Sequence, residues 1–359
     1  MYPERVNRLI VDGVVDAYDY KKALWLDNLV DAERDLGLFY HHCARVGFPR
    51  CALANETDKT TEEGVRARLL NITNNLYHNP LPVPSIAGPE IVTYSDVKRL
   101  VLGVLYTPLG GFELLADMLY DIEKGRGQKF AEFILRPSHE LYCPPCDGRD
   151  HSGDETPDVT GDAQLTIACG DGDSQTWMTK EDFSEHLKNV TAISPTIGEV
   201  WSYIRLNCIH YSVRPHTRFE GPWIANTSHP ILEIGNSADP VTPGRYAKKM
   251  AKGFKGAVAL IQDSGGHCSI SSPSKCTEGY VRKYFQTGEL PPEDTICKPD
   301  ILPFGDDEEV LDAETAELKG RRLQLVTALH ASGGGFMNRH FTGSPWIHLP
   351  LRADGRRRT

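Results

Sequence analysis

Short apolar runs punctuated by aspartate and glycine occur near the start of the chain and again in its last third. The run at 8–16 contains β-branched residues and ends in Asp-Gly-Val-Val-Asp, which is typical of a buried parallel strand. Two further apolar runs, 230–236 and 256–261, are each followed by a helical pattern, at 243–254 and 277–285. This strand–helix–strand–helix order predicts an α/β fold with a parallel sheet.

The long middle of the chain, 19–218, has apolar positions at roughly helical spacing. Ser95 is the expected N-cap of a helix over 96–105, and Pro108 is expected to stop it. A further helix is expected over 112–120.

Polar residues interrupt this pattern at 143–162, where Pro, Gly, Asp and His predict a loop. Helices are expected to resume at 181–188 and at 197–206. Beyond 302 the chain is acidic, then helical in pattern around 313–330, and finally Gly-rich and basic.

These patterns divide the chain into four expected segments. Residues 1–18 supply a first core strand, 19–218 a helical cap, 219–302 an α/β core, and 303–359 an acidic and helical tail. The expected sheet therefore has three strands, and the cap is inserted between the first and the second.

Composition excludes several classes of partner. The 359 residues are 40% hydrophobic and 25% charged, as in ordinary globular proteins, and carry a formal net charge of −10. No basic stripe offsets that charge, so we expect neither nucleic acid nor an anionic membrane as partner. The one basic cluster, Arg356–Arg358, is expected to be a solvated tail. No apolar run approaches the ~18 residues that a spanning helix needs.

Cysteines and glycosylation motifs favour an extracellular location. The chain has nine cysteines and four N-x-S/T motifs, and both features suit an oxidising compartment. The acceptor asparagines of these motifs are Asn55, Asn71, Asn189 and Asn226. The first residues contain no apolar signal-peptide core. We therefore expect a secreted type of protein whose front end is missing from this sequence.

Two candidate site residues follow neighbouring predicted strands. Asp239 comes after the 230–236 run, and His267 comes after the 256–261 run. Loops at the carboxyl ends of parallel strands carry the reactive groups of open α/β sheets. An acid before a histidine is also the chain order of α/β-hydrolase triads. Asp-Pro and Gly-Gly-His are otherwise ordinary turn sequences, but the pair in this order favours a catalytic acid and base.

The segment 231–243, with sequence ILEIGNSADPVTP, resembles the acid-bearing segment of tripeptidyl-aminopeptidase-like hydrolases. The segment 263–269, DSGGHCS, is similar to the histidine segment of that family. The likeness continues through Cys276, 284–291 and 297–300, and weaker matches occur earlier, at 3–16, 167–171 and 219–223. It is dense over about 220–300 and absent after about 303.

The resemblance implies the C-terminal part of an α/β-hydrolase fold with a large helical cap insertion. It also implies a cofactor-free serine hydrolase with no metal, releasing short peptides from free N-termini or cleaving small esters. Asp239 would hold the ring of His267, which would act as the base. The cap would shape access to the pocket. The resemblance says nothing about the oligomeric state.

The family's serine lies in a G-x-S-x-G turn just before the segment matched by 2–6, and no G-x-S-x-G occurs in this sequence. The oxyanion-hole amides are missing with it. We therefore expect the 359 residues as written to lack independent catalysis, whereas an upstream elbow would restore the enzyme. The alternative is a non-catalytic fragment or binding module.

The remaining polar clusters have competing interpretations. The expected disulfides are Cys43–Cys51, Cys169–Cys208 and Cys276–Cys297. Cys143-x-x-Cys146 formally matches a redox or metal motif, but no preceding strand or second pair supports it, so structural loop cysteines are favoured. Cys268 beside His267 is a weak candidate for a surrogate nucleophile, because adjacent side chains on a turn rarely face each other. His41, His42, Asp171 and Asp173 fit solvated or capping roles better than metal ligation.

Overall fold

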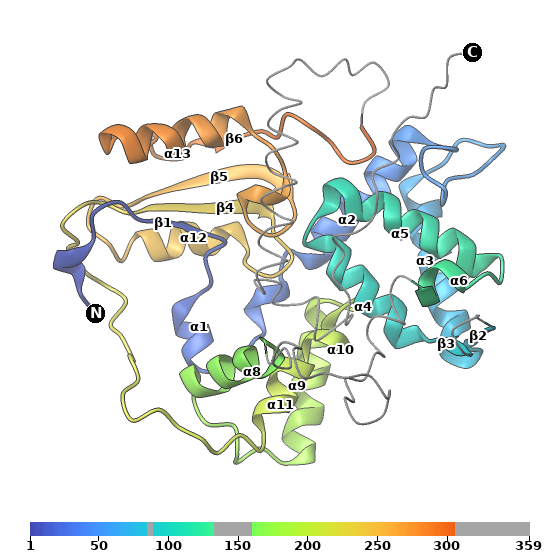
Figure 1. The fold of residues 1–359 in the computed structure, drawn as a ribbon, viewed down its shortest axis with the longest axis horizontal. Coiled ribbons are helices and arrows are strands. Elements are labelled where there is room, and N and C mark those ends of the chain that lie inside the picture. Colours follow the sequence, from blue (N-terminus) through green and yellow to red (C-terminus); the bar gives the residue numbers. More distant parts are fainter. Residues whose placement is uncertain (85–88, 133–159, 306–359) are drawn as a thin grey trace, which may run out of the picture.

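The computed structural model describes residues 1–84, 89–132 and 160–305. A parallel sheet lies on one side of the molecule and helices gather on the other (Figure 1). The sheet joins β1 (Ile10–Asp12) to three strands from the last third of the chain: β4 (Leu232–Ala238), β5 (Val258–Gly265) and β6 (Ile296–Cys297). The predicted α/β class with a parallel sheet is confirmed.

The strand order is β1-β4-β5-β6, with every neighbouring pair parallel. The expectation of three strands was wrong, because β6 adds a fourth. A two-residue strand is too short to show a period in the sequence. Its Cys297 is buried and forms a disulfide with Cys276. Among the described residues β1 and β6 are therefore the edges of the sheet.

Helices α12 (Gly244–Ala251) and α13 (Lys275–Thr287) lie on opposite faces of the sheet (Figure 1). Under α13, Tyr284 packs in a small cluster with Leu232, Ile234, Leu260 and Cys297. A second small cluster joins Val14 of the β1 segment to Ala247 and Met250 of α12. Both clusters are modest in size.

The contact between α12 and β4 depends on two glycines. A Cβ on Gly235 would lie 2.8 Å from the Cα of Gly244, which is closer than side chains pack. The expected first helical residue, Pro243, is instead the N-cap of α12.

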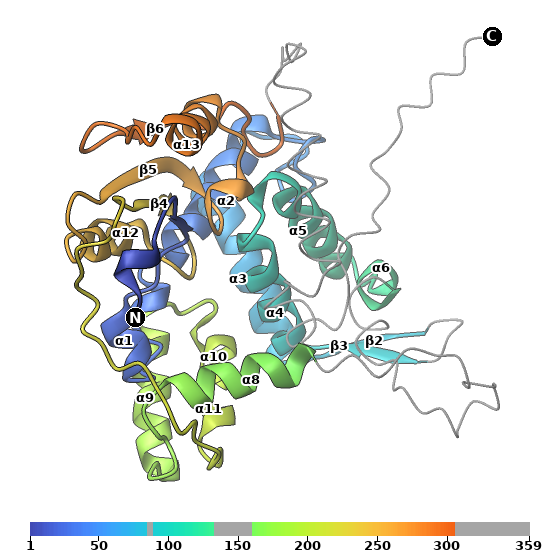
Figure 2. The same ribbon diagram turned by 60° about the vertical axis from the view of Figure 1, so that its left-hand side comes forward.

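The middle of the chain is largely helical, and Figure 2 shows these helices beside and below the sheet. In chain order they are α1 (Ala17–Lys21), α2 (Ala32–Val46), α3 (Glu62–His78), α4 (Tyr94–Leu105), α5 (Pro108–Glu123), α6 (Gln128–Phe130), α8 (Thr160–Asp171), α9 (Lys180–Ile193), α10 (Gly198–Trp201) and α11 (Tyr203–Cys208). A hairpin of β2 (Leu81–Val83) and β3 (Glu90–Val92) interrupts them. The sequence did not reveal this hairpin, because each strand has only three residues.

The start of α4 differs from the prediction by two residues. Thr93, not Ser95, is the N-cap, and it forms a capping box with Asp96 in which each side chain accepts a bond from the other's backbone N–H. The helix ends at Leu105, before Pro108. Pro108 opens α5 instead, since a helix's first turn needs no N–H from it.

Two other boundaries were also misplaced. The helix expected over 197–206 is two short helices, α10 and α11, which meet at Ser202. The predicted loop ends earlier than expected, because 160–162 already belong to α8. The rest of that loop with Cys143 and Cys146, and the tail from 306 with its expected helix and arginines, lie outside the described residues.

One large apolar core unites the helical region. Its members include Leu36 and Phe39 of α2, Leu100 of α4 and Phe112 of α5, all fully buried. The rings of Phe39 and Phe112 meet edge to face, with centroids 5.4 Å apart. No helix of the described residues is both long and apolar enough to cross a membrane.

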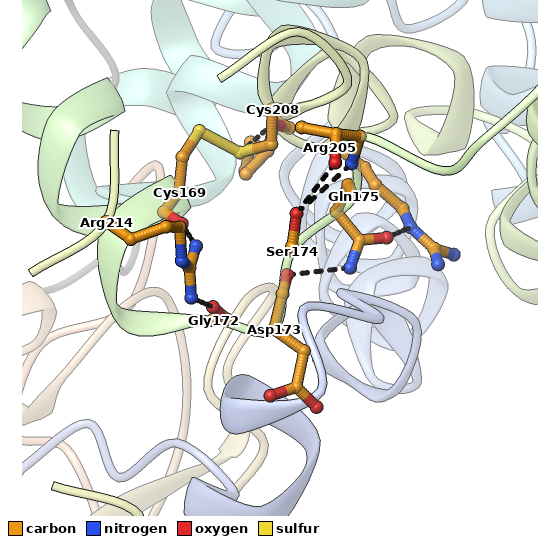
Figure 3. Close-up of a disulfide and its surroundings, with 10 residues drawn as sticks. Cys169, Gly172, Asp173, Ser174, Gln175, Arg205, Cys208 and Arg214 are labelled. Carbon is orange, nitrogen blue, oxygen red and sulfur yellow. Dashed lines mark hydrogen bonds between the residues drawn. A yellow bond between two sulfur atoms is a disulfide. The ribbon is translucent and has the colours of Figure 1, made fainter. Parts of the chain in front are cut away.

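The three expected disulfides are confirmed: Cys43–Cys51, Cys169–Cys208 and Cys276–Cys297. Figure 3 shows the second, which ties α8 to α11. Beside it Arg214 donates to the carbonyl oxygens of Cys169 at 2.6 Å and Gly172 at 2.5 Å. The guanidinium thereby satisfies carbonyls at the end of α8, which has no further helical turn to bond them.

Candidate functional site

The candidate site lies at the carboxyl edge of the parallel sheet. Asp239 directly follows β4, and His267 comes two residues after β5. Because β4 and β5 are adjacent and parallel, the loops after them leave the same edge. The fold therefore brings together the two residues that the sequence singled out.

The carboxylate of Asp239 faces the imidazole ring. His267 Nδ1 lies 3.2 Å from both carboxylate oxygens. Asp239 is fully buried, whereas the His267 side chain is 29% exposed. The backbone N–H groups of Val241, Thr242 and Cys268 also donate to Asp239, at 2.8–3.0 Å. These donors orient the carboxylate independently of the ring. Because Nδ1 is the ring atom that faces the carboxylate, Nε2 is not engaged by Asp239.

The electrostatics of the pair favour a charged imidazolium beside a carboxylate. Burial opposes charge on His267, but the charge of Asp239 and its hydrogen bond outweigh burial, so the pKa of His267 lies well above its usual value. Burial likewise opposes charge on Asp239. The charge of His267 and the hydrogen bonds from the ring and the backbone outweigh it, and the pKa of Asp239 is lowered.

Buried amides hold the loop that carries His267. The Asn236 side chain donates at 2.7 Å to the carbonyl oxygens of Gly266 and Cys268, on either side of the histidine. Gln262 donates to the carbonyl of Ser269 at 3.1 Å. Both amides come from the sheet itself, so the rigid strands set the position of the loop.

Strand β1 supplies a further anchor. The carboxylate of Asp12, at the end of β1, accepts bonds from the backbone N–H of Ser269 at 2.9 Å and from its hydroxyl at 2.7 Å. Burial raises the pKa of Asp12, although these two bonds oppose the shift. The distant N-terminal strand thus reaches the loop just after His267.

The helical region touches His267 directly through Tyr106, which follows α4. The Tyr106 carbonyl accepts the backbone N–H of His267 at 3.1 Å, and the two rings meet edge to face with centroids 5.1 Å apart. Asp35 of α2 is also fully buried here, and a Cβ on Gly265 would lie 2.2 Å from its carboxyl oxygen. Burial and the nearby charge of Asp239 raise the pKa of Asp35 well above its usual value.

Cys268 contradicts one sequence-based argument. Its thiol was expected to point away from its neighbour, yet its Sγ lies within 4.8 Å of both a His267 ring nitrogen and an Asp239 oxygen. The reason is its backbone, since Cys268 has φ 62, a left-handed conformation that redirects the side chain. Burial raises the pKa of this thiol, which makes it a poor nucleophile in the resting state.

The other polar candidates have structural partners. His41 Nδ1 pairs with Glu62 at 2.8 Å, and Asp173 pairs with Arg218 at 2.9 Å. Asp171 accepts the Tyr20 hydroxyl at 3.0 Å. These contacts agree with the solvated or capping roles preferred from the sequence. His42 is different: it is buried inside α2 beside His41, so the solvated or capping role expected of it was wrong.

Residues 194–297 match the family model described as TAP-like protein. The matched segment contains Asp239, His267 and strands β4 to β6. The match supports a relationship to the α/β-hydrolases of this family, in agreement with the parallel sheet. No curated protein matched the chain.

Sequence reasoning missed the residues that hold the pair. Asp12 sits at a strand end, as Asp239 does, and that placement was the available signal. Asn236 and Gln262 read as parts of apolar strands, and nothing local shows that their amides turn towards a loop. Thr242 lies within the segment 231–243, and its hydroxyl is 2.9 Å from Asp239 and 3.0 Å from the His267 ring.

Proposed function

We propose that Asp239 and His267 are the acid and base of a serine-hydrolase site of the aminopeptidase type. The observation that carries this proposal is the 3.2 Å contact between His267 Nδ1 and a fully buried carboxylate at the ends of adjacent parallel strands. In such a site the aspartate fixes the ring tautomer and stabilises the imidazolium. The ring's Nε2 then exchanges a proton with the attacking or leaving group.

The substrates we propose are short peptides with a free N-terminus, with small esters as a second class. Tyr106 brings the helical region into contact with His267, which supports a role for that region in shaping substrate access. No cofactor is needed for this chemistry. We further propose an extracellular setting, which the three disulfides support and with which the exposed positions of Asn55, Asn71, Asn189 and Asn226 agree.

A second candidate is a non-catalytic binding role. It is favoured by the absence of G-x-S-x-G from the 359 residues, since an acid and a base without an activated nucleophile cannot form an acyl-enzyme. For the chain as given we expect no labelling by a fluorophosphonate probe. Stoichiometric labelling that His267→Ala abolishes would reveal a nucleophile outside that motif.

NMR of His267 tests the hydrolase site without requiring turnover. A tripeptide amide with a free N-terminus is added to protein labelled at histidine, and the N-acetylated tripeptide and a small ester serve as comparisons. We expect the free tripeptide to shift the His267 ring resonances more than the acetylated one, and His229, which lies away from the site, to stay unshifted. If none of the three compounds moves the His267 signal, the hydrolase-site proposal fails and the non-catalytic role is preferred.

A further inference from the structure

Among the described residues, one group of histidine, cysteine and acidic side chains can converge on a single cation. It consists of Asp239, His267 and Cys268, whose ligand atoms all lie within 4.8 Å of one another. We propose that this group binds Zn²⁺, and that the bound cation blocks the Asp239–His267 pair.

The ligand chemistry selects the kind of cation. The group offers one thiol sulfur, one imidazole nitrogen and one carboxylate oxygen. Zinc sites in proteins are built from these three ligand types. Ca²⁺ and Mg²⁺ instead need a shell of oxygens, which one carboxylate does not supply. A soft sulfur ligand therefore directs the site towards zinc and similar transition metals.

The distances suit a tetrahedral ion. Nitrogen and oxygen ligands at about 2.0–2.1 Å from zinc are about 3.3 Å apart across a tetrahedral edge. His267 Nδ1 lies 3.2 Å from either oxygen of Asp239, so the cation can replace the proton between them. The Cys268 Sγ lies within 4.8 Å of both ligand atoms, and its thiol donates to the Asp12 carbonyl at 3.3 Å, a bond that zinc binding would replace. The Thr242 hydroxyl, 3.0 Å from Nδ1, lies beside the fourth position, which a water can also take.

The site is both preorganised and reachable. Backbone N–H groups hold Asp239 whether or not the ring is bonded to it, so the carboxylate needs no rearrangement. The His267 side chain is 29% exposed and Cys268 is half-buried. Gly13 leaves the necessary room, because a Cβ there would lie 2.4 Å from Cys268 Sγ and 3.1 Å from His267 Cε1.

Binding is an acid–base exchange without redox change. The Cys268 S–H bond breaks, its proton goes to solvent, and a sulfur–zinc bond forms. The Nδ1 proton of the His267 imidazolium leaves to solvent while the Nε2 proton stays, and Nδ1 donates its electron pair to the metal. The ring then no longer donates to Asp239. Only the inhibitory consequence rests on the proposed hydrolase function, because binding itself depends on the three ligands alone.

Isothermal titration of the full chain with Zn²⁺, after dialysis against EDTA, tests the proposal. Co²⁺ serves as the spectroscopic probe, since a tetrahedral sulfur-containing site produces intense visible bands and a sulfur-to-metal band in the near ultraviolet. We expect one equivalent to bind, and Cys268→Ser to weaken binding by at least about tenfold and remove the sulfur band. Cys268→Gly is the second variant, since glycine adopts φ 62 without strain and its fold is therefore retained.

Asp263→Asn is the matched control. Asp263 is an exposed carboxylate on β5 that bonds Ser237, outside the cluster, so its loss should leave zinc binding unchanged. Binding that both Cys268 variants retain at parent affinity overturns the proposal, as does the absence of binding in the parent. Zinc binding without any peptide-induced shift at His267 would retain this proposal and reject the hydrolase site, so the two failures are distinguishable.

Discussion

The helical region and the sheet region bury their apolar side chains in very different ways. The helices share one continuous core, which includes Leu36 of α2 and Trp201 of α10. The sheet is covered by two small clusters, one beneath each of its flanking helices. The two edge strands keep apolar side chains exposed. Val11 of β1 and Leu9 just before it retain 36% and 39% of their full accessibility, and Ile296 of β6 retains 61%.

The buried polar side chains that surround the candidate site belong to the sheet region, not to the large apolar core. At the carboxyl edge of the sheet, the buried side chains of Asn236, Asp239, Gln262 and Ser271 form a hydrogen-bonded network around His267. Hydrogen bonds between buried polar groups specify one arrangement of the loop. Asn236 contributes through its amide nitrogen, whereas its Oδ1 has no partner among the described residues. The helical region thus supplies most of the apolar burial, while the sheet region fixes the geometry of the site.

Removing an aromatic ring from the large helical core should change the free energy of unfolding more than any other substitution proposed here. Phe112→Ala should lower the free energy of unfolding by about 3–5 kcal/mol, because it opens a cavity against Phe39 in the large core. Val14→Ala, in the small cluster at α12, should cost only about 1–3 kcal/mol. Urea unfolding followed by circular dichroism measures both, with the exposed Leu70→Ala as control. A larger loss for Val14→Ala would reverse the comparison.

Removal of disulfides should have the next largest effect. Replacing Cys276 and Cys297 by serine should cost about 2–4 kcal/mol, because this bridge holds β6 against the sheet. The Cys43–Cys51 bridge closes a shorter loop, with a sequence separation of 8 rather than 21 residues. Replacing both of its cysteines by serine should therefore cost roughly 1 kcal/mol less. Thermal unfolding of both double variants, with mass spectrometry of the remaining bridges, measures the difference. Equal losses would show that chain entropy does not dominate here.

Charge at the site should appear in the pH dependence of stability. The raised pKa of His267 adds stability that is complete below its unfolded value and is lost as pH rises through its folded value. The lowered pKa of Asp239 adds stability that is present above its unfolded value of about 3.9 and is lost as pH falls through its folded value. The pair therefore contributes most between roughly pH 4 and 6.5.

Asp239→Asn should remove that contribution and lower the pKa of His267. Unfolding in urea at a series of pH values measures the first effect, and NMR titration of the ring measures the second. Asp263→Asn, an exposed carboxylate on the same strand as the histidine loop, is the control and should change neither. An unchanged His267 titration in Asp239→Asn would contradict the charge coupling described here.

A substitution on the exposed edge strand β1 should have the smallest effect on stability. It should instead change the self-association of the chain. Unpaired edge strands with apolar side chains promote intermolecular pairing, so we expect the chain to self-associate through β1. Val11→Lys should alter the free energy of unfolding by less than about 0.5 kcal/mol yet reduce self-association. Ile91→Lys, at a more exposed position on β3 in the helical region (56% against 36% for Val11), should not reduce it. Sedimentation at several concentrations decides, and a parent chain that stays monomeric throughout would contradict the prediction.

The sequence by itself determined the features that depend on neighbours along the chain. The apolar runs predicted as strands, 230–236 and 256–261, overlap β4 and β5, since a buried parallel strand needs a continuous apolar stretch. Asp239 and His267 could be singled out because residues that follow parallel strands share one sheet edge. The disulfide pairs were also anticipated. Helix limits were less accurate. Thr93 and Ser95 are both good N-cap residues, and the three-residue spacing of Thr93 and Asp96, which is that of a capping box, was the signal that distinguishes them.

Only the tertiary structure decided which distant groups complete the site. Asp12 bonds Ser269 across 257 positions of the chain, and Tyr106 of the helical region covers His267. The position of the Cys268 thiol depends on a left-handed backbone that no residue type other than glycine announces. The short strand β6 likewise forms because a neighbouring strand and a disulfide are available. Such contacts are set by packing between elements, and a linear pattern carries no record of which elements meet.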